Sequence, residues 1–403
     1  MQVTHLNLVD FRNYRHADVS LSAGPNLVVG RNGQGKTNLV ESLGYLSTLG
    51  SHRVSTDQAL VRQGADAAIV RARVAHGERE FLVEVQINRS GPNKAQVNRG
   101  AVRVRDLPRY FSSVLFAPED LALVRGDPSG RRRYLDQLIV VRSPRIAGVL
   151  ADYERVLKQR NTLLKSARAT GIKGAALSTL DVWDERLIEL GSEIIDERAR
   201  LVAALAQPVR DAYHSVADGD HTPRLIRSLS ILGADPDRAD DATGSGGDAD
   251  AAGSTVASSD AQPAERADIR AAFTQALADI RRKELDRGVT LVGPHRDDVV
   301  FELNGLPAKG YASHGESWSF ALALKLGAAE LLRRDSPSGD PVLVLDDVFA
   351  ELDRGRRARL AEAVAGYQQV IITAAVFDDV PEALRENTIH IRSGEVVEAT
   401  DVE

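Results

Sequence analysis

The stretch Gly30-Arg-Asn-Gly-Gln-Gly35-Lys36-Thr37 decides the fold class of this chain. It matches GxxxxGK followed by Ser or Thr, comes after an apolar strand predicted at residues 26–29, and opens a helical pattern at residues 38–42. Glycines let backbone N–H groups surround phosphates, the lysine neutralises β- and γ-phosphate oxygens, and the hydroxyl ligates Mg²⁺. We therefore predict a loop that binds the phosphates of a nucleotide. Its residues are Gly30, Arg31, Asn32, Gly33, Gln34, Gly35, Lys36 and Thr37.

Two carboxylates supply the second half of the predicted site. They end the apolar run Val342-Leu-Val-Leu-Asp346-Asp347, which is typical of a buried strand. A phosphate-binding loop needs an acidic residue at the end of a neighbouring strand to hold Mg²⁺. We assign Asp346 to the metal, together with Thr37. Asp347 then orients or deprotonates the attacking water, and Lys36 completes the catalytic pair. A plain turn at a strand end is the alternative interpretation of the two carboxylates.

The two halves of this site are far apart in the chain. Lys36 and Asp346 are separated by 310 residues, yet both must reach one triphosphate, so the sheet that carries them is split. Ordinary P-loop kinases and small GTPases lack this arrangement. We predict an α/β head made of residues 1–125 and 289–403, with an inserted arm made of residues 126–288. Besides its mixed sheet, the head should contain an antiparallel meander of strands at residues 68–74, 80–88 and 94–104.

The inserted arm is predicted to be all-helical. Apolar residues recur every three or four positions at residues 146–164, 180–201 and 269–280. The longest of these helices should have roughly 30 residues, or about 45 Å. Residues 233–264 contain seven Asp, one Arg and no aromatic residue, so we predict a disordered acidic insertion there.

Composition limits the class of protein. The chain has 403 residues, of which 43% are hydrophobic and 27% charged, and it lacks an apolar run of the ~18 residues that span a bilayer. It has no cysteine, which excludes disulfides and thiolate chemistry. The first twelve residues lack the apolar stretch of a signal peptide, so we expect a cytoplasmic protein without a membrane partner. The net charge of −6 comes from residues 233–264, so the remaining chain is neutral and can carry basic faces.

Further motifs resemble the ATPase heads of the ABC and SMC type, and more closely the RecF family of DNA repair ATPases. In chain order they are Phe11-Arg12-Asn13-Tyr14, the loop at residues 30–37, Phe116-Ala-Pro-Glu-Asp-Leu121, Val124-Arg-Gly-Asp-Pro128, Arg131-Arg-Arg-Tyr-Leu-Asp136, Gly293-Pro-His-Arg-Asp-Asp298 and Val344-Leu-Asp-Asp-Val-Phe-Ala-Glu-Leu-Asp353. They extend along nearly the whole chain in the family's order. The resemblance implies a split ABC/SMC-type head with ATP and Mg²⁺ as cofactors.

The resemblance also implies a signature loop that touches the γ-phosphate held by a second subunit. Ser313 and Gly315 fit that loop, because they precede an amphipathic run and therefore stand at a helix N-terminus. This chain has Glu316 where the family usually has Gln. An extra carboxylate near a γ-phosphate should slow hydrolysis or shift the contact to Ser313 alone. Without the resemblance, Ser313 and Gly315 are equally well an N-cap and a turn.

Three more positions acquire roles from the resemblance. Residues 351–353 occupy the loop that crosses the dimer interface, and Pro118-Glu119 occupies the coupling loop between head and arm. The switch His of such heads is absent, and Thr373 stands at that strand end as a candidate γ-phosphate sensor. His295 is followed by two Asp residues, but their spacing favours a structural turn over a metal site.

Arginines cluster where the arm leaves and rejoins the head. They lie at residues 125–145 and 281–287, and we predict that they form a phosphate-binding stripe. A solvated charged face is the alternative. Because the chain contains no base-reading motif, binding should follow the shape and backbone of duplex DNA.

The function implied by the resemblance is that of a weak, DNA-stimulated ATPase that acts as a switch. ATP should join two copies face to face around duplex DNA at gaps or single-strand junctions, and hydrolysis should release them. The family assists the loading of RecA together with RecR and RecO, in replication, recombinational repair and the SOS response. A structural DNA tether of the SMC kind and an ABC transporter ATPase subunit are the alternatives.

Overall fold

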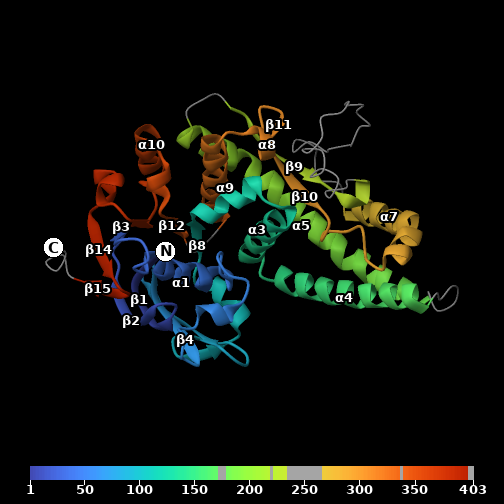
Figure 1. Cartoon of the computed structure of the whole chain (residues 1–403), viewed down its shortest axis with the longest axis horizontal. Helices are drawn as coiled ribbons and strands as arrows, with labels where there is room; N and C mark the ends of the chain where they lie inside the picture. The colour runs from blue at the N-terminus through green and yellow to red at the C-terminus, as the bar shows by residue number, and fades with distance from the viewer. Residues whose placement is uncertain (171–177, 218–220, 234–265, 336–338, 398–403) are drawn as a thin grey trace. The chain divides into compact units, whose positions relative to one another are not determined.

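The computed structural model describes residues 1–170, 178–217, 221–233, 266–335 and 339–397 (Figure 1). The chain divides into two compact units. The head unit comprises Met1–Leu121, Gln207–Asp220 and Trp318–Glu403, and the arm unit comprises Ala122–Ala206 and His221–Ser317. None of the described helices combines the length and the apolar character that a membrane span requires.

The head unit is built around a mostly parallel sheet with the strand order β15-β14-β3-β13-β12-β8. Its strands are β3 (Gly24–Val29), β8 (Ser113–Phe116), β12 (Val342–Asp346), β13 (Gln369–Ala374), β14 (Asn387–Arg392) and β15 (Glu395–Val397). Pairing is parallel throughout, except that β15 forms an antiparallel hairpin with β14. Every residue of β12 and β13 is buried, which explains their continuous apolar sequences. The loops after β3 and β12 therefore leave the sheet at the same edge.

A second sheet of the head unit is antiparallel, with the order β2-β1-β4-β5-β6-β7. Its strands are β1 (Gln2–Phe11), β2 (Tyr14–Ser20), β4 (Ala67–His76), β5 (Arg79–Asn88), β6 (Lys94–Val97) and β7 (Gly100–Val102). The expected meander is confirmed, but the single strand expected at residues 94–104 is wrong. Asn98 and Arg99 have φ angles of 50° and 66°, and they form the tight turn that separates β6 from β7.

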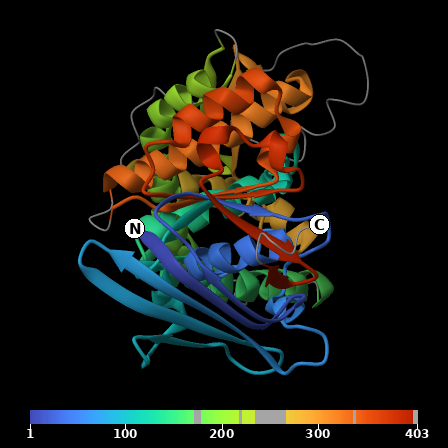
Figure 2. The ribbon, with the colours of Figure 1, turned by 90° about the vertical axis from the view of Figure 1, so that its left-hand side faces the viewer.

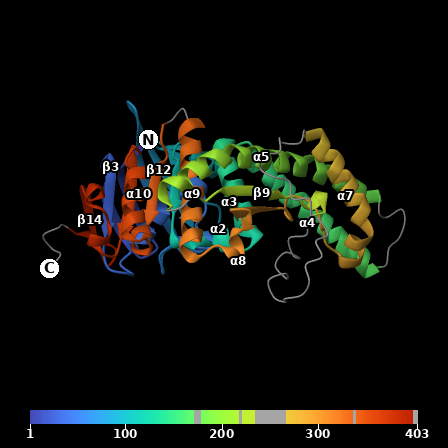
Figure 3. The same ribbon diagram turned by 90° about the horizontal axis from the view of Figure 1, so that it is seen from above.

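Helix α1 (Lys36–Thr48) packs between the two sheets (Figure 2). Its Leu39, Leu43 and Leu46 share one hydrophobic core with Leu8 of β1 and Val344 of β12. Helices α9 (His314–Asp335, in the head unit from Trp318 on) and α10 (Arg354–Val364) cover the other face of the mostly parallel sheet (Figure 3). Short 3₁₀ helices connect these elements: η1 (Asp57–Leu60), η2 (Val104–Arg109), η3 (Pro118–Asp120), η6 (Val348–Glu351), η7 (Phe377–Asp379) and η8 (Glu382–Leu384).

The arm unit combines helices with a small antiparallel sheet. Its elements are α2 (Leu121–Arg125), α3 (Pro128–Arg142), α4 (Ile146–Thr170), α5 (Ser178–Val216), β9 (Pro223–Ser228), η5 (Ser230–Leu232), α7 (Arg266–Arg287), β10 (Asp298–Leu303), β11 (Leu306–Pro307) and α8 (Ala308–Tyr311). Its core includes Tyr153, Leu187 and Phe273, from α4, α5 and α7. The expectation of an all-helical arm is wrong, because β9 pairs with β10 over six residue pairs.

The compact units differ from the predicted boundaries at three places, the first being residues 122–125, which belong to the arm unit rather than to the head. Residues 289–317 belong to the arm unit, because β10 pairs with β9 there. Residues 207–220 belong to the head unit, where Tyr213 of α5 packs edge-on against Phe320 of α9. Helix α5 has 39 residues rather than the roughly 30 predicted for the longest arm helix. The acidic insertion predicted at residues 233–264 lies, from residue 234 on, outside the described residues.

Candidate functional site

The glycines of the loop after β3 are required by its backbone and by its neighbours. Gly33 and Gly35 have φ angles of 80° and 119°, which other residues strongly disfavour. A Cβ atom on Gly35 would lie 2.7 Å from Asn13 Nδ2, and one on Gly30 would collide with the carbonyl oxygen of Ile391. The loop therefore passes its neighbours too closely to carry side chains at these positions.

Those neighbouring segments also hold the loop by hydrogen bonds. The Tyr14 hydroxyl donates to the Gly35 carbonyl oxygen at 3.0 Å, and Asn13 Nδ2 donates to the Gln34 carbonyl oxygen at 3.2 Å. From β14–β15, the N–H of Gly394 donates to the same Gln34 oxygen at 2.9 Å. The sequence motif contained Asn13 and Tyr14 without giving them a role, because no local pattern predicts contacts across twenty residues. The structure assigns them to fixing the shape of the loop.

The loop places the N-terminus of α1 at the site. Its N-cap residue is Gly35, α1 has no acidic residue in its first turn, and no side chain from the described residues caps it. The first N–H groups of α1 are therefore available to an anion, which the helix dipole also favours. Lys36 is buried, and its Nζ contacts the Arg31 carbonyl oxygen at 3.4 Å. Arg31 and Asn32 are exposed at the tip of the loop.

The structure brings Thr37 and Asp346 together from opposite halves of the chain. Thr37 Oγ1 donates to Asp346 Oδ1 at 3.2 Å. Burial raises the pKa of Asp346 to about 6, the nearby charge of Asp347 adds to the increase, and hydrogen bonds from Thr373 and Thr37 oppose it. A hydroxyl and one carboxylate fit Mg²⁺, which proteins hold with few side chains and the phosphates of a nucleotide. The described residues contain no cluster of three acidic or His side chains that would form a complete metal site without a nucleotide.

Asp347 is held in an unusual conformation at the end of β12. Its φ angle is 50°, in the left-handed region that Asp and Asn tolerate better than most residues. Its Oδ1 is buried and has no hydrogen-bond partner among the described residues. Burial raises the pKa of Asp347, and the charge of Lys36 acts in the opposite direction. A buried carboxylate oxygen without a partner, beside a lysine of the phosphate-binding loop, is suited to binding a water molecule.

Thr373, at the end of β13, connects the two carboxylates. Its hydroxyl donates to Asp346 Oδ1 at 2.5 Å, and the N–H of Asp347 donates to Thr373 Oγ1 at 2.9 Å. The residue is fully buried. The resemblance suggested Thr373 as a γ-phosphate sensor, whereas in this structure its hydroxyl contacts Asp346 and Asp347.

A buried ion pair fixes α1 from its far side. Arg12 donates from Nε and Nη2 to the two carboxylate oxygens of Glu41, at 2.8 and 2.6 Å, and the Ser51 hydroxyl donates to Glu41 at 2.5 Å. Burial alone would raise the pKa of Glu41, but the hydrogen bonds from Arg12 and Ser51 hold it below its ordinary value. This bidentate pair accounts for the Arg of the Phe11–Tyr14 motif.

The signature-loop candidate belongs to the arm unit, where Ser313 is the N-cap of α9. Ser313 Oγ accepts from the N–H of Glu316 at 3.2 Å, and Glu316 Oε2 accepts from the N–H of Ser313 at 2.7 Å. These two bonds form a reciprocal capping box. Glu316 Oε1 also lies 3.7 Å from Nδ1 of His221. Ser313 itself is exposed, and Gly315 is half-buried.

Other residues singled out by the sequence have structural partners. Asp353 caps α10 by accepting from the N–H of Arg356 at 3.0 Å, and Glu119 lies 3.9 Å from Arg53. His295 is largely buried, and its Nδ1 lies 2.8 Å from the Tyr153 hydroxyl. Burial lowers the pKa of His295 to about 4, so its imidazole is neutral near pH 7. The preference for a structural turn at His295 agrees with these contacts.

Three of the arginines expected to form a phosphate-binding stripe pair with carboxylates of the arm unit. Arg131 makes a bidentate, buried pair with Asp298 at 2.8 and 2.7 Å. Arg281 pairs with Asp181 and Asp184, at 2.7 and 2.9 Å, and Arg145 pairs with Glu193. These three arginines of the predicted stripe therefore make ion pairs within the arm unit. Sequence reasoning missed this because the partners are between 48 and 167 residues away.

Known proteins resemble this chain over almost its whole length. The family model described as "RecF/RecN/SMC N terminal domain" matches residues 2–395. A relative from Clavibacter sepedonicus named "DNA replication and repair protein RecF" is 65% identical, and the match covers 99% of this chain and 95% of the relative. A protein of the same name from Leifsonia xyli is 63% identical, over 99% of this chain and 100% of the relative.

Solved structures show the same likeness. A structure described as the recombination mediator protein RecF with ATPrS in the RecFOR pathway has a TM-score of 0.83 and 28% identity, covering 99% of this chain and 98% of the other. A Pyrococcus furiosus Smc head domain, at 16% identity and a TM-score of 0.51, covers 98% of this chain and 95% of the other, and shows the fold alone. The predicted α/β fold of the ABC/SMC-type ATPase head is thereby confirmed. This chain belongs to the RecF family.

Proposed function

We propose that this chain is an ATP-dependent DNA-binding protein of replication and recombinational repair. The observation that carries the proposal is the meeting of Thr37, Asp346 and Asp347 beside the uncapped N-terminus of α1. Two solved relatives described as RecF with ATP or ATPrS support the nucleotide. The relatives named "DNA replication and repair protein RecF" support the process.

Each side chain of the nucleotide site has one task. The N–H groups of residues 33–37 and the Lys36 ammonium bind the phosphates. Thr37 and Asp346 hold Mg²⁺, which supplies positive charge against the phosphate oxygens. Asp347 orients the attacking water and accepts its proton, a task for which its buried Oδ1 is suited. Hydrolysis is slow and acts as a switch.

ATP joins two copies of the chain, each nucleotide meeting the Ser313 loop of the partner copy. Ser313 is exposed and Gly315 lies in the first turn of α9, so the Ser313 hydroxyl and nearby N–H groups can approach a phosphate. The carboxylate of Glu316 is part of the same turn. Because it repels a γ-phosphate, the closed pair is weaker than one with Gln at this position.

The closed pair holds duplex DNA without reading its sequence, at gaps and single-strand junctions. RecR and RecO are the proposed partners in loading RecA, and the RecFOR pathway named for the solved relatives supports this choice. Stimulation of ATP hydrolysis by duplex DNA would separate this function from that of a transporter subunit.

Light scattering tests the central step, with and without ATP and duplex DNA. The molecular mass of the wild type, measured by light scattering, should double when ATP is added. Lys36→Met should keep the mass of one chain, because it lacks the lysine charge that binds the phosphates. Lys158→Met, which changes an exposed lysine of α4, is the matched control and should behave as wild type. Doubling by Lys36→Met in ATP would contradict the proposal.

A further inference from the structure

The far end of the antiparallel sheet carries a concentration of positive charge. Strand β7 is the edge strand, so among the described residues one side of its backbone has no neighbouring strand. Around it lie five exposed basic side chains, which we call the basic rim: Lys94, Arg99, Arg103, Arg105 and Arg109. They come from β6, the β6–β7 turn, and η2 with its N-cap residue Arg103, all within the head unit.

Two like charges of the rim lie beside the last residue pair between β6 and β7. Ala95 of β6 pairs with Val102 of β7, and Lys94 and Arg103 are the residues directly outside that pair. Both side chains are exposed, and both line the same hollow in the surface. Like charges that lie close together repel each other. An anion bound between them would remove that repulsion.

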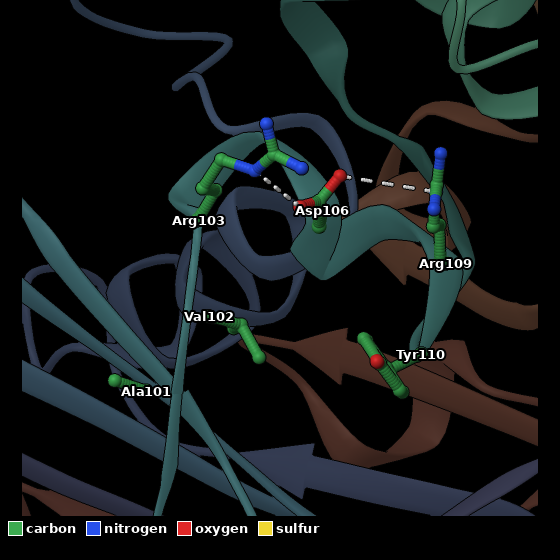
Figure 4. Close-up of a pocket in the computed structure, with 6 residues that line it drawn as sticks. All are labelled: Ala101, Val102, Arg103, Asp106, Arg109 and Tyr110. Atoms are coloured by element: carbon green, nitrogen blue, oxygen red, sulfur yellow. Dashed lines mark ion pairs between the residues drawn. The ribbon is translucent and has the colours of Figure 1, made fainter.

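Acidic residues do not neutralise the rim. Asp106 is shared by two of its members, lying 3.3 Å from Arg103 and 3.9 Å from Arg109 (Figure 4). Lys94, Arg99 and Arg105 make no ion pair with any residue that the structure describes. The contrast with the arm unit is clear, since Arg131, Arg145 and Arg281 are all paired there.

The surface beside the rim carries two hollows, both of which are lined in part by β7. A hollow of about 630 Å³ is lined by Lys94, Arg103 and Arg105, together with Gln96 and Ala101. A second hollow of about 380 Å³ is lined by Arg103, Arg109 and Tyr110 among others. The small side chain of Ala101 lines both, so a large ligand can approach the backbone of β7 closely.

We infer that the basic rim binds the phosphate backbone of duplex DNA. This inference rests on the proposed function and adds a surface to it. Four of the five rim residues are Arg, which forms bidentate bonds to phosphate. A duplex presents one negative charge per about 1.7 Å of its axis, so several rim residues can each contact a phosphate of the same duplex. The contacts carry no base specificity.

A charge-neutralising variant tests the rim. Lys94→Gln, Arg99→Gln and Arg105→Gln together remove the three unpaired charges and keep a polar, uncharged side chain at each position. The matched control is Arg155→Gln with Arg186→Gln and Arg200→Gln, three exposed arginines of the arm unit that each pair with a carboxylate. Thermal unfolding of each variant establishes that it is folded. Duplex affinity is measured in ATP by fluorescence anisotropy, from about 50 to 200 mM salt.

The expected result is a change in salt dependence as well as affinity. Losing three phosphate contacts should reduce the slope of log K against log salt by ~2.7, and the affinity near 0.1 M salt by about 10²- to 10³-fold. The control triple variant should keep the wild-type slope. A rim variant with the slope and affinity of wild type would overturn the inference.

Other outcomes identify what else the rim does. Wild-type protein that does not bind duplex DNA in ATP would overturn the proposed function itself. A rim variant that retains duplex binding but loses binding of polyglutamate would assign the rim to an acidic protein partner and overturn the DNA assignment.

Charged edge strands also prevent edge-to-edge association. If the triple variant self-associates in sedimentation, Arg105→Gln alone should still reduce the slope by ~0.9, and an unchanged slope would overturn the inference.

Discussion

Replacing Asp347 with Asn should separate the proposed ATP-driven closure from ATP hydrolysis. The φ angle of 50° at Asp347 is tolerated by Asn, and the bond to Thr373 Oγ1 comes from the backbone N–H, which the substitution keeps. Asp346 retains its hydrogen bonds from Thr37 and Thr373. The site should therefore keep its shape, and Asp347→Asn should still bind ATP and close.

The magnitude follows from the chemical role of the lost group. Loss of a general base typically costs 10²- to 10⁴-fold in rate, which corresponds to about 3 to 5 kcal/mol of barrier. If hydrolysis limits opening, the closed pair should live longer by a comparable factor. Because the substitution also removes a buried charge whose Oδ1 lacks a partner, the melting temperature without nucleotide should not decrease.

The assay combines single-turnover ATP hydrolysis with the lifetime of the closed pair after an ADP chase. Asp378→Asn, which changes a carboxylate with 89% of its side chain exposed, is the matched control and should resemble wild type. Asp346→Asn should instead lose both closure and hydrolysis, because it removes the metal-binding carboxylate. Normal hydrolysis by Asp347→Asn would show that Asp347 is a strand-end carboxylate without a catalytic role.

Three further substitutions and one pH series test the remaining contacts of the site. Thr373→Val removes a donor to Asp346 and an acceptor, so the free energy of unfolding in urea should fall by about 1 to 3 kcal/mol, and Thr373→Ser should recover most of it. Gly35→Ala should weaken binding of a fluorescent ATP analogue at least tenfold, about 1.4 kcal/mol, because its Cβ would collide with Asn13; unchanged affinity would contradict the close approach. Glu316→Gln keeps the capping box but removes a charge, so the ATP concentration needed for closure, read by light scattering, should decrease. The pKa of Asp346 is raised from 3.8 to about 6, so its contribution to nucleotide-free stability is full below pH 3.8 and is lost as the pH rises to about 6. Urea midpoints across this range should show that loss in wild type and not in Asp346→Asn.

Local patterns predicted two loops that the structure places together at one edge of the mostly parallel sheet. The loop at residues 30–37 and the pair Asp346-Asp347 each follow a buried strand, and burial of a parallel strand produces a continuous apolar run that is visible in sequence. Because both strands are parallel members of one sheet, their carboxyl ends had to meet. The contact between Thr37 and Asp346 agrees with that expectation.

Contacts between distant residues could not be predicted in the same way. The pairing of β9 with β10 joins segments 70 to 80 residues apart, and no local pattern in either segment identifies such a distant partner. The role of Thr373 depends on two hydrogen bonds to β12 that no spacing rule contains. Arg131 looked like a free charge in the sequence because Asp298, its partner, is 167 residues away. An arginine-rich sequence therefore predicts a phosphate-binding surface poorly until the carboxylates have been assigned.

The sequence left two interpretations of Ser313 open, a γ-phosphate contact and a helix N-cap. Both interpretations involve the same chemical groups. A capping box holds the Ser313 hydroxyl and the first N–H groups of α9 in place, and these are the groups that a γ-phosphate would need. The cap contributes about 1 kcal/mol to the helix, so a phosphate that displaces Glu316 from the Ser313 N–H must offset roughly that amount. With Gln the displaced group is neutral, whereas the carboxylate of Glu316 also remains near the phosphate and repels it. If the proposed pair forms, the residue that stabilises α9 in the single chain should therefore oppose its closure, so closure should need a higher ATP concentration than with Gln at this position.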